Sequence, residues 1–228
     1  IPGILTSSYI FGYGVLVNIV LAIIFALSFE AIMLKLRKRP LTVYLGDNSA
    51  LLTAVIIGVA LPPLAPWWLT LIGIFFAIVI AKQLYGGLGY NIFNPAMVAY
   101  AILLISFPAQ MTTYWQTPVM MLSQLGGQSL SLWETINFQL FSQLPQGLTI
   151  DALTSASPLG IVRTSIMSSA GTISEIAAQG KTFGVFGGIG TEWVNLAFLG
   201  GGLFMLRKGL ISWHIPLSLL ATLGFLSL

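Results

Sequence analysis

The chain has 228 residues, of which 57% are hydrophobic and 7% are charged, and its mean hydropathy is +0.94. A soluble domain carries about 25% charged residues, so this composition excludes an ordinary soluble protein and indicates a bilayer as the solvent. The net charge of +3 comes from bases that form no solvated patch, which argues against a nucleic-acid partner. With no cysteine, one histidine and six scattered acids, we expect no disulfide, iron–sulfur cluster or other metal site within this chain.

Apolar runs predict six membrane segments, because about twenty residues cross a bilayer as a helix. In chain order the segments are 9–34, 49–61, 66–82, 95–107, 193–208 and a last one from residue 213. The last segment is still apolar where the sequence ends, and we therefore expect the chain to be a fragment. The second and fourth are short, and glycine or proline lies beside them. Such segments are typical of discontinuous helices whose free ends bind polar ligands, although small helices buried within a bundle have the same pattern.

Basic residues mark one side of the predicted membrane protein. They follow the first, third and fifth segments at 35–39, Lys82 and 207–208, and these places hold seven of the nine bases. Alternation puts all three on the same side, which the positive-inside rule makes cytoplasmic. We therefore predict a first transmembrane bundle over 1–107, an extracytoplasmic connection over 108–192 and the start of a second bundle over 193–228.

The motif "YGGLGYNIFNPAM" lies at the start of the fourth segment. Gly87 and Gly89 permit unusual backbone angles and close approach, whereas Asn91 and Asn94 can satisfy freed backbone groups. Free N–H groups at the following helix start would favour an anion or a polar ring system. No βαβ pattern surrounds the glycines, so a dinucleotide site is excluded. A binding site on the broken helix and an ordinary loop are the two interpretations.

Two ionisable positions lie at the predicted cytoplasmic boundary of the first and second segments. Glu30 is interpreted as an interfacial ion pair with Lys35 or Arg37, and the alternative is a place on an ion path. Asp47 and Asn48 precede the second segment and are typical of a helix N-cap.

His214 begins the last segment, beside Trp213. A histidine here can titrate near neutral pH and carry protons. The simpler interpretation is interfacial packing against the indole.

The stretch "DALTSASPLG", residues 151–160, is a polar island in an apolar chain. Asp151 precedes three hydroxyl side chains, at Thr154, Ser155 and Ser157. Residue chemistry favours an Asx or ST turn that ends at the following proline. The alternative is a modification site, because a hydroxyl flanked by a small residue (Ala156) and a proline is sterically open.

Four blocks carry a resemblance to a known family: "DNSALLTAVIIGVALPPLAPWW", "AKQLYGGLGYNIFNPAMVAYAILLISFPAQMT", "WVNLAFLGGG" and "WHIPLSLLATL". Through them the chain resembles the NqrB/RnfD family. Its members include the RnfD subunits of Rnf ion-translocating electron-transport complexes and, more distantly, the NqrB subunits of sodium-pumping quinone reductases. The resemblance covers nearly the whole chain.

The resemblance implies an all-α integral membrane protein of the bacterial inner membrane. Its fold would be a multi-pass helical bundle with discontinuous helices and a urea-transporter-like inverted repeat, of which this chain holds the first repeat and part of the second. Residues 108–192 would lie on the periplasmic side.

The family also implies a covalent flavin. Its attachment motif reads Asp, two residues, Ser or Thr, a small residue, Ala, then a Thr that carries FMN through a phosphoester. The matching residues are Asp151, Thr154, Ala156 and, at the acceptor place, Ser157 instead of threonine. A serine hydroxyl can form the same bond, which a flavin transferase of the ApbE type makes. A second, non-covalent flavin such as riboflavin is also implied.

The implied function is that of a membrane subunit in a ferredoxin:NAD oxidoreductase complex coupled to sodium or proton transport. The chain would be an electron relay without catalytic residues of its own, and other membrane and iron–sulfur subunits would be its partners in the bilayer. A channel or secondary transporter of small solutes and a structural subunit without flavin are the alternatives.

Overall fold

A computed structural model describes residues 1–118, 129–154, 183–184, 187–188 and 190–226. Almost all of the regular structure in these residues is helical, as the sequence predicts. Two short strands, β1 (Phe183–Gly184) and β2 (Gly187–Gly188), pair antiparallel.

The described helices include long apolar elements and short connecting ones. They are α1 (Pro2–Phe11), α2 (Gly14–Leu36), α3 (Leu41–Leu45), α4 (Ser49–Ala60), α5 (Trp67–Ile74), the π-helix η1 (Phe75–Gln83), α6 (Pro95–Ser106), α7 (Pro108–Thr113), α9 (Leu132–Phe141), α10 (Ile150–Leu153), α13 (Thr191–Arg207) and α14 (His214–Leu226).

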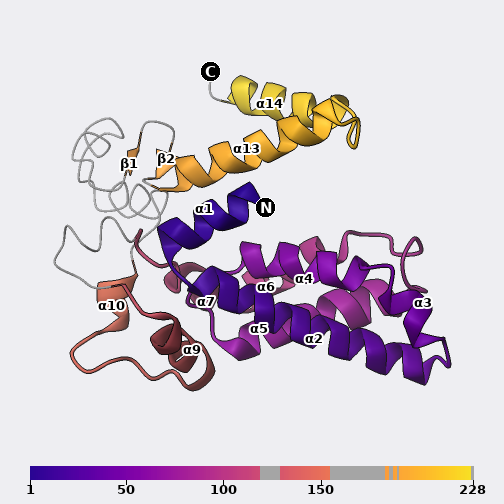
Figure 1. Ribbon diagram of the computed structural model, residues 1–228, viewed down its shortest axis with the longest axis horizontal. Helices are drawn as coiled ribbons and strands as arrows, with labels where there is room; N and C mark the ends of the chain where they lie inside the picture. Colours follow the sequence, from indigo (N-terminus) through magenta and orange to yellow (C-terminus); the bar gives the residue numbers. More distant parts are fainter. Residues whose placement is uncertain (119–128, 155–182, 185–186, 189, 227–228) are drawn as a thin grey trace.

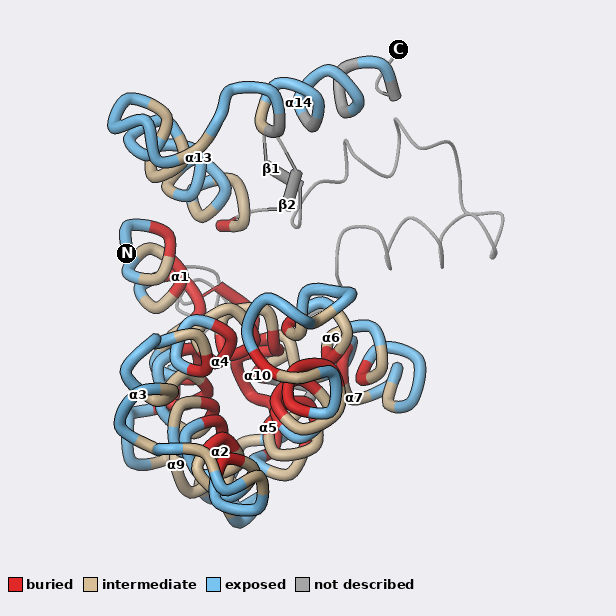
Figure 2. The backbone as a smooth tube through the Cα atoms, turned by 90° about the vertical axis from the view of Figure 1, so that its right-hand side faces the viewer, coloured by how far each residue is buried: buried red, intermediate tan, exposed pale blue. Residues whose placement is uncertain are grey.

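The elements α2, α4, α5–η1 and α6 form a bundle that contains the main hydrophobic core (Figure 1). Figure 2 shows the buried residues gathered where these helices face one another. Small side chains such as Ala22, Ala26, Ala54 and Ala99 are buried in this core. Small residues let helix backbones approach closely, which is how helices associate in membranes without a hydrophobic driving force between them.

The second, third and fourth predicted segments are confirmed as α4, α5–η1 and α6. The first is confirmed as α2 over Gly14–Leu36, but its predicted start at Tyr9 is wrong, because α1 ends at Phe11 and the chain reverses direction before α2 (Figure 1). Gly12 makes this turn with a φ of 77°, a conformation that favours glycine. The α1 helix packs against α13 instead of continuing α2.

Within the described residues, α2 alone combines 23 residues with the apolar composition needed to cross a membrane. Three shorter apolar helices accompany it: Ser49–Ala60, Trp67–Gln83 and Pro95–Ser106. The predicted short elements are therefore present. Six membrane crossings, the urea-transporter-like repeat and the division at 107 and 192 stay predictions.

The α13 and α14 helices lie outside the main bundle, on the side of α1 (Figures 1 and 2). Their large apolar side chains are mostly exposed, among them Leu203, Phe204 and Leu217. They match the fifth and sixth predicted segments in position, and exposed apolar helices of this kind are compatible with a lipid surrounding.

Candidate functional site

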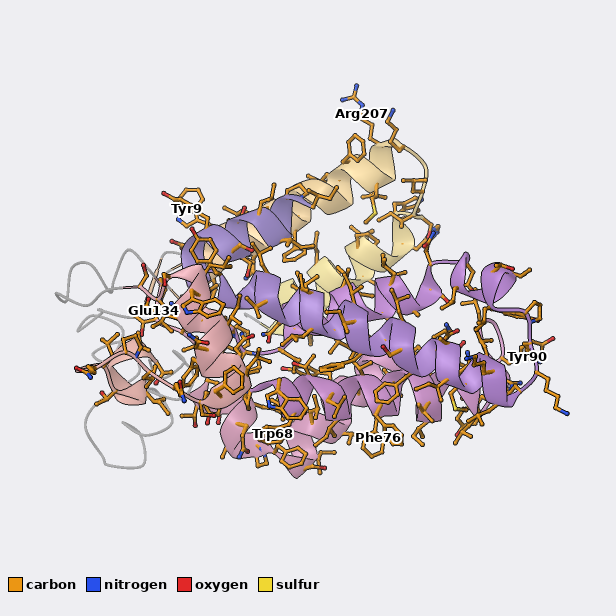
Figure 3. The ribbon with its side chains drawn as sticks, turned by 60° about the horizontal axis from the view of Figure 1, so that its bottom comes forward. Tyr9, Trp68, Phe76, Tyr90, Glu134 and Arg207 are labelled. Carbon is orange, nitrogen blue, oxygen red and sulfur yellow. The ribbon has the colours of Figure 1, made fainter. Side chains whose placement is uncertain are left out.

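The bundle has two chemically different ends. Figure 3 shows Tyr90, in the glycine-rich loop, at one end and Glu134, in α9, at the other. Arg37 and Arg39 bind the backbone of the first end, where their Nη1 atoms donate to Gln83 O at 2.9 Å and Gly86 O at 3.3 Å. The first end is therefore basic, and the second carries the segment that leads into the predicted attachment motif.

A buried ion pair joins α2 to η1 near the basic end. Lys82 Nζ lies 2.8 Å from Glu30 Oε1, and both side chains are 2% exposed. Gln83 Nε2 donates to the same oxygen at 2.7 Å, whereas Glu30 Oε2 has no hydrogen-bond partner among the described residues. The two inward-facing side chains come from the last turn of the π-helix, an element that often occurs at functional sites.

The interpretation of Glu30 as a pair with Lys35 or Arg37 is wrong. The partner is Lys82, 52 positions along the chain, whereas Arg37 Nη1 donates to Gln83 Oε1 at 2.8 Å. Sequence proximity suggested the neighbouring bases, but α2 turns Glu30 toward η1 and into the core. Ionisable residues inside membrane segments usually face the bundle interior and pair with one another. This rule could have directed the search for the partner of Glu30 beyond the adjacent bases.

A series of hydrogen bonds connects the ion pair to exposed residues at the start of α4. Lys82 Nζ donates to Ser49 Oγ at 2.7 Å, and Ser49 Oγ and N both donate to Asp47 Oδ1. The predicted N-cap is thus partly confirmed. Asn48 occupies the cap position in a left-handed conformation, but its side chain makes no capping hydrogen bond. The Asp47 carboxylate accepts the Ser49 N–H instead.

The glycine-rich loop has the predicted backbone but a different pattern of hydrogen bonds. Gly87 and Gly89 have φ angles of 104° and 86°, and Asn91 Nδ2 donates to Phe93 O. Asn94 Oδ1 accepts from the N–H groups of residues 96 and 97 at 2.9 and 3.4 Å. The helix start therefore has no free N–H group in its first turn for an anion, and a flavin or ion site here stays a prediction.

His214 lies at the start of α14 with its ring stacked on Trp213, at 4.1 Å between centroids. The side chain is exposed. The packing against the indole is confirmed, and a role in carrying protons stays a prediction.

At the opposite end, the structure describes the first half of the predicted attachment motif. Asp151 belongs to α10, and Thr154 Oγ1 donates to Ile150 O at 3.0 Å. Thr154 also forms an isolated antiparallel bridge with Gln116. The Thr154 hydroxyl is thus bonded to the preceding helix α10. Ala156 and Ser157 lie outside the described residues.

A second hydrophobic cluster ties this motif to the bundle. Leu153 is 1% exposed and packs with Leu64, Leu130 and Phe138. Leu64 belongs to the segment 61–66 between α4 and α5, which we call the helix break. The motif is therefore anchored on the helix break and on α9.

The α9 helix begins with a capping box. Ser131 Oγ accepts from the Glu134 N–H, and the Ser131 N–H donates to Glu134 Oε2 at 2.8 Å. This backbone bond and the Ser131 hydroxyl lower the pKa of Glu134 below its ordinary value. The capping box therefore stabilises α9 above the ordinary pKa of glutamate, and this contribution is lost as pH falls through the lowered pKa.

Comparison with known proteins gives consistent results. The model of the NQR2, RnfD, RnfE family matches residues 1–228. The D subunit of an ion-translocating oxidoreductase complex from Aliivibrio salmonicida is 49% identical over 230 residues, which are 100% of this chain and 65% of that protein. The corresponding protein of Cronobacter sakazakii, which has the same name, is 49% identical over 100% of this chain and 65% of its own length.

A third relative of the same name, from Alcanivorax borkumensis, is 49% identical over 98% of this chain and 61% of its own length. The chain thus spans somewhat less than two thirds of the proteins it resembles. Because the family model covers every residue, the chain belongs to the NQR2, RnfD, RnfE family.

Proposed function

We propose that this chain is a membrane subunit of an ion-translocating ferredoxin:NAD oxidoreductase complex, with FMN joined to Ser157 as an electron relay. The names of its relatives describe one component of an ion-translocating oxidoreductase complex, so further subunits, including iron–sulfur ones, are expected partners. Bound FMN accepts and donates one or two electrons, and the protein supplies its position and electrostatics.

The observation that carries the proposal is the position of the motif relative to the bases. Arg37, Arg39 and Lys82 lie at one end of the bundle, and the residues up to Thr154 are anchored at the opposite end. If the basic end is cytoplasmic, the motif lies on the periplasmic side of the bacterial inner membrane. An ApbE-type transferase would then act on it there.

The residues fit FMN attachment by their hydroxyl chemistry. Thr154 Oγ1 already donates to Ile150 O in α10, so it is a poor site for attachment, whereas Ser157 stands at the family's acceptor place. A serine oxygen can form a phosphoester with the FMN phosphate. Formation of this ester releases one water, so the mass of the chain increases by the mass of FMN minus that of water.

Fluorescence of the denatured chain tests the proposal. We expect a fluorescent band on a denaturing gel when the chain is made in cells that express the transferase. Ser157→Ala should abolish the band, because no oxygen remains to form the phosphoester. Ser155→Ala is the matched control and should keep it, because alanine preserves the small residue that the motif has at this place. A dark band for the unaltered chain, or a fluorescent band for Ser157→Ala, would contradict the attachment.

The sidedness has its own test, because the chain has no cysteine. Gln146 is exposed between α9 and α10, so Gln146→Cys should react with an impermeant thiol reagent added to spheroplasts. Tyr90→Cys, in the exposed loop at the basic end, should react after lysis only. The reverse pattern would put the motif in the cytoplasm.

A further inference from the structure

The helix break has more hydrogen-bond acceptors than donors. All of its residues are buried, and the prolines at 62, 63 and 66 supply carbonyl groups without N–H groups. The N–H groups of the other three residues are already used, with Ile57 O, Tyr114 O and Pro62 O as their acceptors. The segment between α4 and α5 therefore presents an excess of carbonyl oxygens to the interior of the protein.

Two buried side-chain amides from other helices contact this segment. Asn18 Nδ2, in α2, donates to Pro62 O at 2.8 Å, and Gln139 Nε2, in α9, donates to Pro63 O at 2.7 Å. Both side chains are fully buried. Pro62 O also accepts from the Ala65 N–H at 2.9 Å, so the break does not need Asn18 to satisfy this carbonyl. The burial of a polar amide at position 18 therefore has another reason.

The oxygen atoms of both amides are buried without a hydrogen-bond partner among the described residues. Each amide nitrogen faces a carbonyl, which can only accept, and this fixes the orientation of the amide. Thr70 Oγ1, in the first turn of α5 directly after the break, is a third buried oxygen without a described partner. Buried polar groups are normally paired, and exceptions of this kind point to an ion or a water that completes the site.

The two amides lie near each other. Gln139 Nε2 donates to Gly14 O at 3.3 Å in addition to Pro63 O. In the α2 helix the carbonyl of Gly14 faces the N–H group four residues later, which is that of Asn18. The amides are therefore within one turn of α2 and lie against consecutive carbonyls of the break.

From this arrangement we infer that the helix break holds a cation site, in which Asn18 Oδ1, Gln139 Oε1 and carbonyl oxygens of the break bind a dehydrated monovalent metal ion such as Na⁺. Transport of the ion rests on the proposed function of the chain, whereas its binding requires neither flavin nor electron transfer. The scarcity of cysteine, histidine and acids argues against a transition-metal site, but Na⁺ requires only oxygen ligands.

The neutrality of the ligands selects the class of ion. Asn18, Gln139 and the backbone carbonyls carry no charge, and the break itself contains no charged residue. Divalent cations usually take carboxylate ligands, whereas unwound carbonyls at broken membrane helices coordinate Na⁺ in transporters. Amide oxygens are hydrogen-bond acceptors that do not titrate, so the site does not hold a proton in place of the metal ion.

The test is equilibrium binding of radioactive Na⁺ to the purified complex in detergent, with choline used to keep the ionic strength constant. Asn18→Leu should weaken the binding of one Na⁺ about tenfold or more, since contacts with a charged group have about this value. Asn18→Asp should strengthen it, because the carboxylate keeps an oxygen and adds a negative charge. Pro62 O retains the Ala65 N–H in both variants.

Two further variants complete the test. Gln139→Leu removes the second amide oxygen from a different helix and should also weaken the binding of Na⁺. Asn195→Leu is the matched control, because it makes the same exchange as Asn18→Leu at an exposed position of α13, and its binding of Na⁺ should equal that of the unaltered complex.

The site would be overturned by equal binding of Na⁺ to Asn18→Leu and to the unaltered complex, which would leave a buried water as the partner of the amide oxygens. Weaker binding by Asn18→Asp as well as by Asn18→Leu would assign Asn18 a structural role alone, and an equal loss in Asn195→Leu would show an unspecific effect. A complex that binds Na⁺ here but moves no ion during electron transfer would instead contradict the proposed function and leave the site in place.

Discussion

Replacing Lys82 with methionine is expected to destabilise the protein by about 3–5 kcal/mol, because the Glu30 carboxylate is then left buried without its counter-charge. The pair is 2% exposed on both sides, so water cannot replace the ammonium group. Gln83 Nε2 would remain as the donor to Glu30, and one amide does not neutralise a carboxylate. The midpoint of thermal unfolding in detergent should fall by about 10 °C.

The double variant Glu30→Gln with Lys82→Met separates the loss of the pair from loss of packing. Replacing both charges by neutral groups of similar size is often nearly neutral, so the double variant should regain most of the stability that Lys82→Met loses. Lys35→Met changes a base on α2 that forms no ion pair with an acid among the described residues and should change the midpoint little. Equal midpoints for the Lys82→Met and double variants would show that the buried charge is not the cause.

Gly14→Ala is expected to have an effect of similar size for a steric reason. A Cβ at position 14 would lie 1.9 Å from Pro63 O, and backbone at a proline break cannot move aside as a flexible side chain does. Overpacking of this kind costs about 3 kcal/mol. Unfolding of the purified chain, followed by tryptophan fluorescence, should show the loss.

The matched control is Gly200→Ala in α13, where a Cβ meets no atom within 4 Å. Alanine is favoured over glycine in a helix by about 1 kcal/mol, so this variant should be as stable as the unaltered chain or slightly more stable. If Gly14→Ala were equally well tolerated, the close contact between α2 and the helix break would be wrong.

The sequence predicts local elements well where composition and breakers decide them. The prolines at 62 and 63 end α4, and Asn94 with Pro95 starts α6, as their chemistry requires. The reversal at Gly12 was missed, because apolar character continues through the turn. Hydropathy reports burial in lipid or protein, but it does not report the direction of the chain.

The contacts between residues far apart in the chain could not be predicted from the sequence. Glu30 and Lys82 both stand out in the sequence as charges beside apolar segments, yet their pairing depends on how α2 faces η1. Gln139 gave no signal at all, because an amide in a short amphipathic helix is usually solvated. Its buried Nε2 donates to Pro63 O in the helix break, 76 positions earlier, and this contact depends on how α9 packs on the bundle. Residues 151–154 are anchored at the end of the bundle opposite the bases, and the sidedness inferred from the alternation of charge stays a prediction.

The most direct test of the central claim is the mass of the peptide that contains Ser157, taken from chain made in cells with the ApbE-type transferase. We predict the peptide mass plus FMN less one water, with fragmentation placing the added mass on Ser157. An unmodified peptide, or an added mass on Thr154 or Ser155, would contradict it.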